Sequence, residues 1–198
     1  VSYCGLITDR FLFYLAEFSN TTLKQLNISG CNKITNYGLI ALCNDKRDRR
    51  PIGVDLAELQ LELAEGGKPE VHVQPSVSVT SSNSSNGKDA GLWQEVNPFP
   101  YSRGCTLLES LELNGVHKVH DAGVVAMSQL SMLQTLSIRN LEHVTDSPLL
   151  LLAESCRHLQ SLDISGIDMA SLQVVEAFAD HCYKLETLNC ELCNFTSG

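Results

Sequence analysis

The chain has 198 residues, of which 43% are hydrophobic, and a formal net charge of −9. The apolar content supports a sizeable core, and the acidic balance excludes a non-specific nucleic-acid binder, which needs a cationic face. No apolar run approaches the roughly 18 residues that indicate a membrane-spanning helix. The eight cysteines are too few for a disulfide scaffold.

Residues 1–43 begin with a partial copy of the segment that follows. Val1 to Asp9 align with Ile28 to Asn36 at an offset of 27 residues, and their apolar and hydroxyl positions coincide. Val1 therefore corresponds to the last apolar residue of a strand. We expect the chain to begin within a repeat.

The first complete pattern starts at Leu23. Leu26 and Ile28 alternate with polar residues, which predicts a short strand with one buried face. An apolar residue three places later turns the chain back into the core, and Thr35 with Asn36 offers N-cap side chains for a helix. The pattern predicts a strand, a turn and a helix.

The period fails after residue 43. Residues 44–51 are charged and end in a proline, and the spacing of Leu56, Leu59 and Leu61 then predicts a degenerate repeat. Residues 1–63 are therefore interpreted as the N-terminal part of the repeat array. The basic residues of the charged run belong to a solvated loop or, as the alternative, form a nuclear signal or a contact for an acidic partner.

Residues 64–104 have little periodicity and are rich in Gly, Pro and Ser. This composition favours a disordered or loosely ordered insertion. Alternating valines between positions 71 and 79 leave an edge strand as an alternative, and Leu92, Trp93 and residues 99–101 are apolar islands suited to dock on the repeats. The insertion is either neutral or carries a partner motif or a phosphorylation site.

The pattern resumes four times in residues 105–198. Its leading leucines recur every 25 or 26 residues, at Leu108, Leu133, Leu159 and Leu185. Thr145 and Asp146 again offer N-cap side chains. The helix after them has one apolar face, formed by Leu149, Leu152, Ala153 and Cys156. The last strand and turn end at Cys193 with no helix after them.

A single repeat of this kind cannot bury its own apolar face, so neighbouring repeats must stack. We predict an α/β fold, namely a horseshoe-shaped solenoid of short parallel strands and helices with about six repeats and one long loop insertion. Residues 1–63 and 105–198 form its two parts. Because both ends fall within a repeat, we expect the chain to be a window cut from a longer solenoid.

The repeats resemble the cysteine-containing subclass of leucine-rich repeats. The matching residues are Cys4, Ile7, Thr8 and Asp9; Cys31, Ile34 and Thr35; Cys156 and Leu159; and Cys182 and Leu185. His120 departs from the pattern because it replaces the threonine. The subclass is found most often in F-box proteins. The resemblance thus implies the substrate-recognition region of a cullin-RING ubiquitin ligase, which binds a Skp-type adaptor and a cullin through a module outside this chain.

Cys190 and Cys193 form a C-x-x-C motif near Cys182, and these are residue types of a zinc site. In the repeat register, however, Cys182 and Cys193 occupy slots that cysteines also occupy in other repeats. Free cysteine behaves as a small buried hydrophobe. We therefore interpret the cysteines as core residues, expect no metal or other cofactor, and place the protein in a reducing compartment, the cytoplasm or nucleus.

His117, His120 and Asp121 lie in one turn and have the residue types of acid–base chemistry. The sequence has no nucleophile motif, glycine-rich phosphate loop or paired-carboxylate motif to accompany them. We interpret them as solvated turn residues and predict a protein that is not an enzyme. Four glycosylation sequons are interpreted as chance occurrences, at Asn20, Asn27, Asn83 and Asn194.

The remaining candidate site is the concave face of the predicted solenoid, onto which the residues alternating with buried strand positions project. We predict that a protein partner binds Gln25, Asn27, Ser29, Ser110, Glu112, Asn114, Thr135, Ser137, Arg139, Ser161, Asp163, Ser165, Thr187, Asn189 and Glu191. This face is polar and mildly acidic and lacks large aromatic anchors. It suits a basic or polar protein segment.

The sequence therefore predicts a protein-interaction scaffold without nucleic-acid or membrane partners. Its leading interpretation is the F-box-type substrate receptor of a ubiquitin ligase. The alternative is a non-ligase regulator or inhibitor that binds a protein partner with the same repeats. An enzyme or metal protein is the third hypothesis.

Overall fold

The computed structural model describes residues 1–43, 104–193 and 195, in which helices and strands alternate. In chain order they are α1 (Asp9–Phe18), β1 (Gln25–Asn27), α2 (Asn36–Cys43), β2 (Ser110–Glu112), α5 (Asp121–Met127), β3 (Thr135–Ser137), α6 (Asp146–Ser155), β4 (Ser161–Asp163), α7 (Leu172–His181) and β5 (Thr187–Asn189). The predicted charged run and degenerate repeat, and all but the last residue of the predicted insertion, lie outside the described residues. Within the described part of the chain, no helix is both long and apolar enough to cross a membrane.

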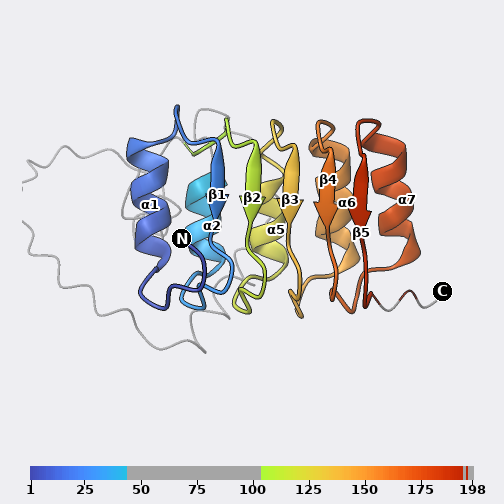
Figure 1. Ribbon diagram of the computed structural model, residues 1–198, viewed down its shortest axis with the longest axis horizontal. Helices are drawn as coiled ribbons and strands as arrows, with labels where there is room; N and C mark the ends of the chain where they lie inside the picture. Colours follow the sequence, from blue (N-terminus) through green and yellow to red (C-terminus); the bar gives the residue numbers. More distant parts are fainter. Residues whose placement is uncertain (44–103, 194, 196–198) are drawn as a thin grey trace, which may run out of the picture. The chain divides into compact units, whose positions relative to one another are not determined.

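The strands form one parallel sheet in the order β1-β2-β3-β4-β5. Equivalent leucines are register partners across the four strand pairs, namely Leu26, Leu111, Leu136, Leu162 and Leu188. β1 pairs directly with β2, although residues 44–103 separate them in the sequence. The helices form a second layer, in which each packs against the next along the chain (Figure 1). This α/β arrangement is consistent with the predicted repeat solenoid.

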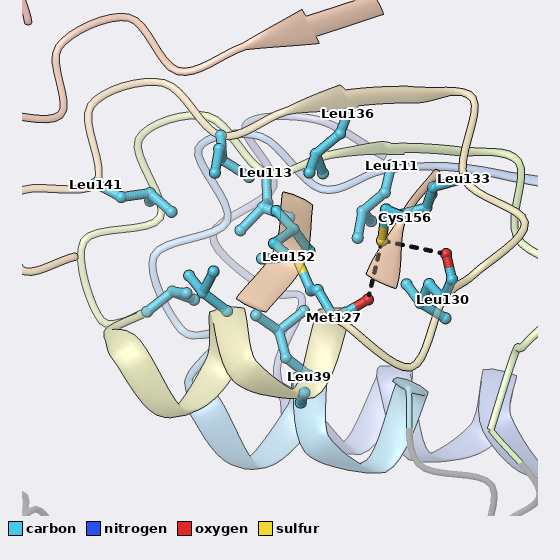
Figure 2. Packing of buried hydrophobic residues seen from close by; sticks show 14 of the residues in the cluster. Leu39, Leu111, Leu113, Met127, Leu130, Leu133, Leu136, Leu141, Leu152 and Cys156 are labelled. Atoms are coloured by element: carbon cyan, nitrogen blue, oxygen red, sulfur yellow. Dashed lines mark hydrogen bonds between the residues drawn. The ribbon is translucent and has the colours of Figure 1, made fainter. Parts of the chain in front are cut away.

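The core lies between the strands and the helices. Leu111, Leu136 and Leu162 are at most 1% exposed, whereas Leu188 in β5 is half-buried. Figure 2 shows leucines from several repeats gathered with Met127 between the two layers. Replacing one fully buried leucine by alanine costs about 2–5 kcal/mol, so this shared apolar layer holds the repeats together.

In each described repeat, a residue with left-handed backbone geometry follows the strand position. These residues have φ between 52° and 71°, and they are Tyr3, Gly30, Gly115, Asn140, Gly166 and Leu192. Glycine adopts this geometry freely, whereas a side chain such as that of Leu192 costs about 1–2 kcal/mol. The Asn140 side chain lies against Gly166, where a β-carbon would clash with its amide oxygen. The turn therefore has the same geometry in each repeat even where glycine is absent.

Hydrogen bonds join the helix N-termini of neighbouring repeats. Asp9, at the start of α1, accepts a bond from the Thr35 backbone N–H at 2.8 Å and another from its hydroxyl at 2.7 Å. Asp121, at the start of α5, accepts the same pair from Thr145 at the same distances. Each carboxylate therefore ties the start of its own helix to the start of the next helix.

Burial raises the pKa of Asp9 above its ordinary value of 3.8, and the hydrogen bonds from Thr35 offset only part of that rise. A carboxyl group that loses contact with water favours its neutral form, whereas donors pointed at its oxygens favour the charged form. Lys118 also lowers the pKa, but it is the weakest of these influences. Desolvation is therefore the largest influence on the pKa of Asp9.

Thr145 is the N-cap residue of α6, as predicted, but its side chain makes no capping bond to that helix. Its hydroxyl donates to the preceding repeat instead. The prediction is confirmed for Thr35, whose oxygen accepts a bond from the Tyr37 backbone N–H at 3.2 Å. Asn36 caps the following helix, because its oxygen accepts bonds from the backbone N–H groups of His120 and Gly123 at 2.9 and 3.1 Å.

Candidate functional site

The outward residues of the five strands share one face of the sheet, because the middle residue of each strand points to the opposite side. We define the polar sheet face as Gln25, Asn27, Ser110, Glu112, Asn114, Thr135, Ser137, Arg139, Ser161, Asp163, Thr187, Asn189 and Glu191. Ser29 and Ser165 were predicted on the same surface, but they are only 4% and 1% exposed. The structure places these two serines inside the turns, where they contribute no surface.

Side chains from β1 and β2 are bonded to each other on this face. The Asn27 amide nitrogen donates to a Glu112 carboxylate oxygen at 2.7 Å. The Asn27 oxygen accepts a bond from the Ser29 backbone N–H at 3.0 Å, which closes the turn after β1. Glu112 therefore has one oxygen committed to the neighbouring strand, and its other oxygen makes no hydrogen bond within the described residues.

The turns after β4 and β5 use the same device as the turn after β1. Asp163 accepts a bond from the Ser165 backbone N–H at 3.0 Å, and Asn189 accepts one from the Glu191 backbone N–H at 3.2 Å. An amide oxygen and a carboxylate oxygen thus perform the same structural task at equivalent positions. The fold requires an acceptor at position 163, and it does not require a negative charge there.

Asn114 accepts two hydrogen bonds through its side chain in the middle of the polar sheet face. Its side-chain oxygen accepts the Ser137 hydroxyl and the Arg139 backbone N–H, both at 2.8 Å. Ser137 is therefore held close to the sheet, with its single hydroxyl hydrogen directed toward Asn114. The Arg139 side chain stays 45% exposed beside this junction.

The polar sheet face carries three carboxylates, on Glu112, Asp163 and Glu191, and one cation, on Arg139. Arg139 Nε lies 3.6 Å from Asp163 Oδ2, which is longer than a hydrogen bond. Exposed pairs of this kind contribute at most about 1 kcal/mol. The face is therefore acidic, and its one cation only partly neutralises Asp163.

A row of hydroxyl groups runs beside the charged positions. Ser110, Thr135, Ser161 and Thr187 are register partners on consecutive strands. Their hydroxyls make no hydrogen bond within the described residues, and adjacent strands lie about 4.8 Å apart. The row therefore offers unused donors and acceptors at regular intervals across four strands.

The eight cysteines are free thiols, and among the described residues five of them donate to backbone carbonyls of an earlier repeat, namely Cys31, Cys105, Cys156, Cys182 and Cys193. Cys156 donates to the Met127 and Leu130 carbonyls at 3.9 and 3.5 Å, as Figure 2 shows. Cys182, in the equivalent slot, donates to the Ala153 and Cys156 carbonyls at 3.7 and 3.4 Å. Burial raises the pKa of Cys156 to about 12. The predicted core role of these two cysteines is confirmed, because both are at most 2% exposed and both donate to backbone carbonyls.

The C-x-x-C motif is divided between two environments. Cys193 donates to the Ile164 carbonyl at 3.2 Å, just as Cys31 donates to the Val1 carbonyl at 3.3 Å in an earlier repeat. Cys190 is half-buried in a strand slot. No group of three or more His, Cys, Asp or Glu side chains within the described ranges is placed to hold a metal ion.

The histidine turn does not bring its residues together as an acid–base group. His117 Nδ1 lies 3.7 Å from a Glu142 oxygen, and the His120 ring lies 5.0 Å from the ring of His143. Both oxygens of Asp121 are bonded to Thr145. Asp121 is therefore part of the helix junction and does not orient a histidine.

Two of the four sequon asparagines have their amide nitrogens engaged. Asn20 donates to the Ala16 and Glu17 carbonyls at the end of α1, at 3.1 and 3.2 Å. Asn27 donates to Glu112. Because glycosylation modifies this nitrogen, both sites are poor acceptors in the folded protein. Asn83 and Asn194 lie outside the described residues.

Sequence reasoning missed the two sets of bonds between repeats, those of the carboxylates and those of the thiols. A signal for them was present, because Asp9 and Asp121 each follow a helix-start residue at the same repeat position. That phase identifies equivalent residues, but it does not identify their partners. The partners lie in a neighbouring repeat, so they can be identified only from the stacked structure.

A family model described as a leucine-rich repeat matches residues 19–43. This segment begins at Ser19, directly after α1, and covers all of β1 and all of α2. No curated protein matches the chain at a significant level. Repeats of this family are typically non-enzymatic scaffolds with extended binding surfaces. The repeat match and the parallel sheet with its exposed polar face therefore suggest a protein–protein interaction scaffold.

Proposed function

We propose that the protein binds a protein partner across the polar sheet face and acts by holding that partner in position. The observation that carries the proposal is the row of four hydroxyls without hydrogen-bond partners within the described residues, on the same face as the Glu112 carboxylate. Buried or structural polar groups are normally paired. This row stands on a sheet whose bonds between repeats leave its backbone little freedom, so a partner would meet a preorganised surface.

We further propose that the partner is a substrate of a cullin-RING ubiquitin ligase and that the chain is the receptor region of an F-box-type subunit in the cytoplasm or nucleus. The support is the resemblance of the cysteine-containing repeats to those of F-box proteins. In this mechanism the chain itself performs no covalent chemistry. It holds the substrate while a separate module binds the Skp-type adaptor and the cullin.

The alternative is a regulator that uses the same face without a ligase. Affinity purification of the full-length protein separates the two functions, because the receptor co-purifies with a Skp-type adaptor and a cullin. Recovery of neither, from cells in which another F-box protein recovers both, contradicts the ligase proposal and leaves the binding face untouched.

The binding face is tested by the substitutions Thr135→Arg and Ser161→Arg, which put long side chains onto the row of hydroxyls. Neither hydroxyl has a structural bond in the described residues, so we expect the thermal midpoint to change little. Partner recovery in affinity purification should fall at least tenfold. The matched control is Ser147→Arg, which adds the same side chain at an exposed position of α6. Equal partner recovery by all three variants contradicts the proposal.

A further inference from the structure

We propose that the segment bound on the polar sheet face is extended and basic, with lysine or arginine side chains paired to Glu112 and Asp163. The inference rests on the proposed function and adds the chemistry of the partner. Within the described residues no helix packs on this face, and its charged groups set the sign of the charge that an occupant must carry. Carboxylates attract cations most strongly where the partner also excludes water.

Glu112, Ser137 and Asp163 are consecutive register partners on β2, β3 and β4. Two strand spacings separate the Cα atoms of the two acidic residues by roughly 10 Å. The residue between them is small, and its hydroxyl donates to Asn114. The carboxylates of Glu112 and Asp163 thus flank the Ser137 side chain, which is too short to cover them.

Neither carboxylate is fully used by the fold. One oxygen of Glu112 accepts the Asn27 amide, and one oxygen of Asp163 accepts a backbone N–H. The second Asp163 oxygen makes no hydrogen bond within the described residues, and it lies 3.6 Å from Arg139 Nε. Each acid therefore retains an oxygen that a cationic side chain of a partner can pair with.

The dimensions of the face fit a short extended segment. Five strands span about 19 Å from first to last, and an extended chain advances about 3.3 Å per residue. A segment of about six residues therefore crosses the whole sheet. An acidic segment is disfavoured, because it meets three carboxylates and only Arg139 as a counter-charge.

The probes are two fluorescein-labelled synthetic peptides of about ten residues, one alternating Lys with Ser and the other alternating Glu with Ser. Fluorescence anisotropy measures their binding to the full chain. We expect the Lys peptide to bind more tightly and its affinity to fall as salt is added. Tighter binding of the Glu peptide would overturn the inference.

The decisive variant is Glu112→Gln with Asp163→Asn. Glutamine keeps an acceptor for Asn27, and asparagine already closes the equivalent turns at positions 27 and 189. The variant should fold, and its Kd for the Lys peptide should rise about fivefold. The matched control is Glu154→Gln with Asp180→Asn, which removes the same charge from exposed positions of α6 and α7. An equal loss in both double variants means non-specific attraction and overturns the inference.

A second variant, Arg139→Gln, tests the same inference by removing a positive charge from the face, which should strengthen binding of the Lys peptide. It removes the side chain that partly neutralises Asp163 and leaves the Arg139 backbone bond to Asn114 intact. We expect the Lys peptide to bind about two- to threefold more tightly, and unchanged or weaker binding contradicts the inference. One further outcome separates the two proposals. If Thr135→Arg blocks the protein partner while Glu112→Gln with Asp163→Asn leaves it bound, the proposed binding face is supported and the proposed basic segment is contradicted.

Discussion

Thr145 gives both of its donors to Asp121, its backbone N–H at 2.8 Å and its hydroxyl at 2.7 Å. The two residues belong to different repeats, and Thr35 makes the same pair of bonds to Asp9. A threonine at the start of one helix is thus hydrogen-bonded to the start of the helix in the previous repeat. This junction has measurable consequences for stability.

Asp121→Asn should destabilise the protein by about 1–3 kcal/mol, because the amide nitrogen that replaces one oxygen cannot accept a bond from Thr145. Urea unfolding followed by circular dichroism measures the change. Asp168→Asn serves as the control, because this exposed turn residue has no hydrogen bond or ion pair among the described residues, and it should change stability by less than about 0.5 kcal/mol. Equal midpoints for the two variants would show that the junction contributes nothing.

Ser171→Thr should stabilise the protein by about 0.5–1.5 kcal/mol. Ser171 donates its backbone N–H to Asp146 at 2.8 Å, but its buried hydroxyl has no partner in the part of the chain that the structure describes. Threonine has a restricted χ1 angle and makes the missing bond at both equivalent positions. Differential scanning calorimetry measures the gain, with Ser147→Thr as the control on the exposed surface of α6. A lower melting temperature for Ser171→Thr refutes the expectation.

The Asp9 carboxyl should titrate above 3.8, because burial raises its pKa in the folded protein. The folded state then binds a proton more tightly than the unfolded state, so this group favours folding most below 3.8 and loses that contribution as pH rises through the raised pKa. Carbon-13 NMR of the Asp9 carboxyl measures the midpoint directly. In Asp9→Asn this part of the pH dependence of stability should disappear. A midpoint at or below 3.8 contradicts the assignment.

Cys156 should resist alkylation in the folded protein, because its pKa of about 12 leaves almost no thiolate near neutral pH. Iodoacetamide labelling followed by peptide mass spectrometry should modify the half-buried Cys4 and Cys190 first. Cys156 should react only as the chain unfolds, so urea should accelerate its labelling. Labelling of Cys156 as fast as Cys4 in the native protein would contradict the buried, protonated state.

Local residue spacing is enough to predict where the strands and turns lie. The alternation of Leu111 and Leu113, repeated in Leu136 and Ile138, places both side chains of each pair on one side of a strand, and all four are at most 1% exposed. A period of two requires only local backbone geometry and a preference of apolar groups for the interior. For the same reason the core role of Cys156 was predictable from its slot.

The bonds between repeats could not be predicted from residue spacing, because they depend on how consecutive repeats stack. Thr145 satisfies the rule for a helix N-cap, yet its hydroxyl bonds to a carboxylate 24 residues earlier. Ser29 and Ser165 follow the alternation of surface residues, yet the turns bury them. In each case the outcome depends on the donors, acceptors and volume supplied by the neighbouring repeat. Local spacing determines which way a side chain points, and the stacking of repeats determines what it meets.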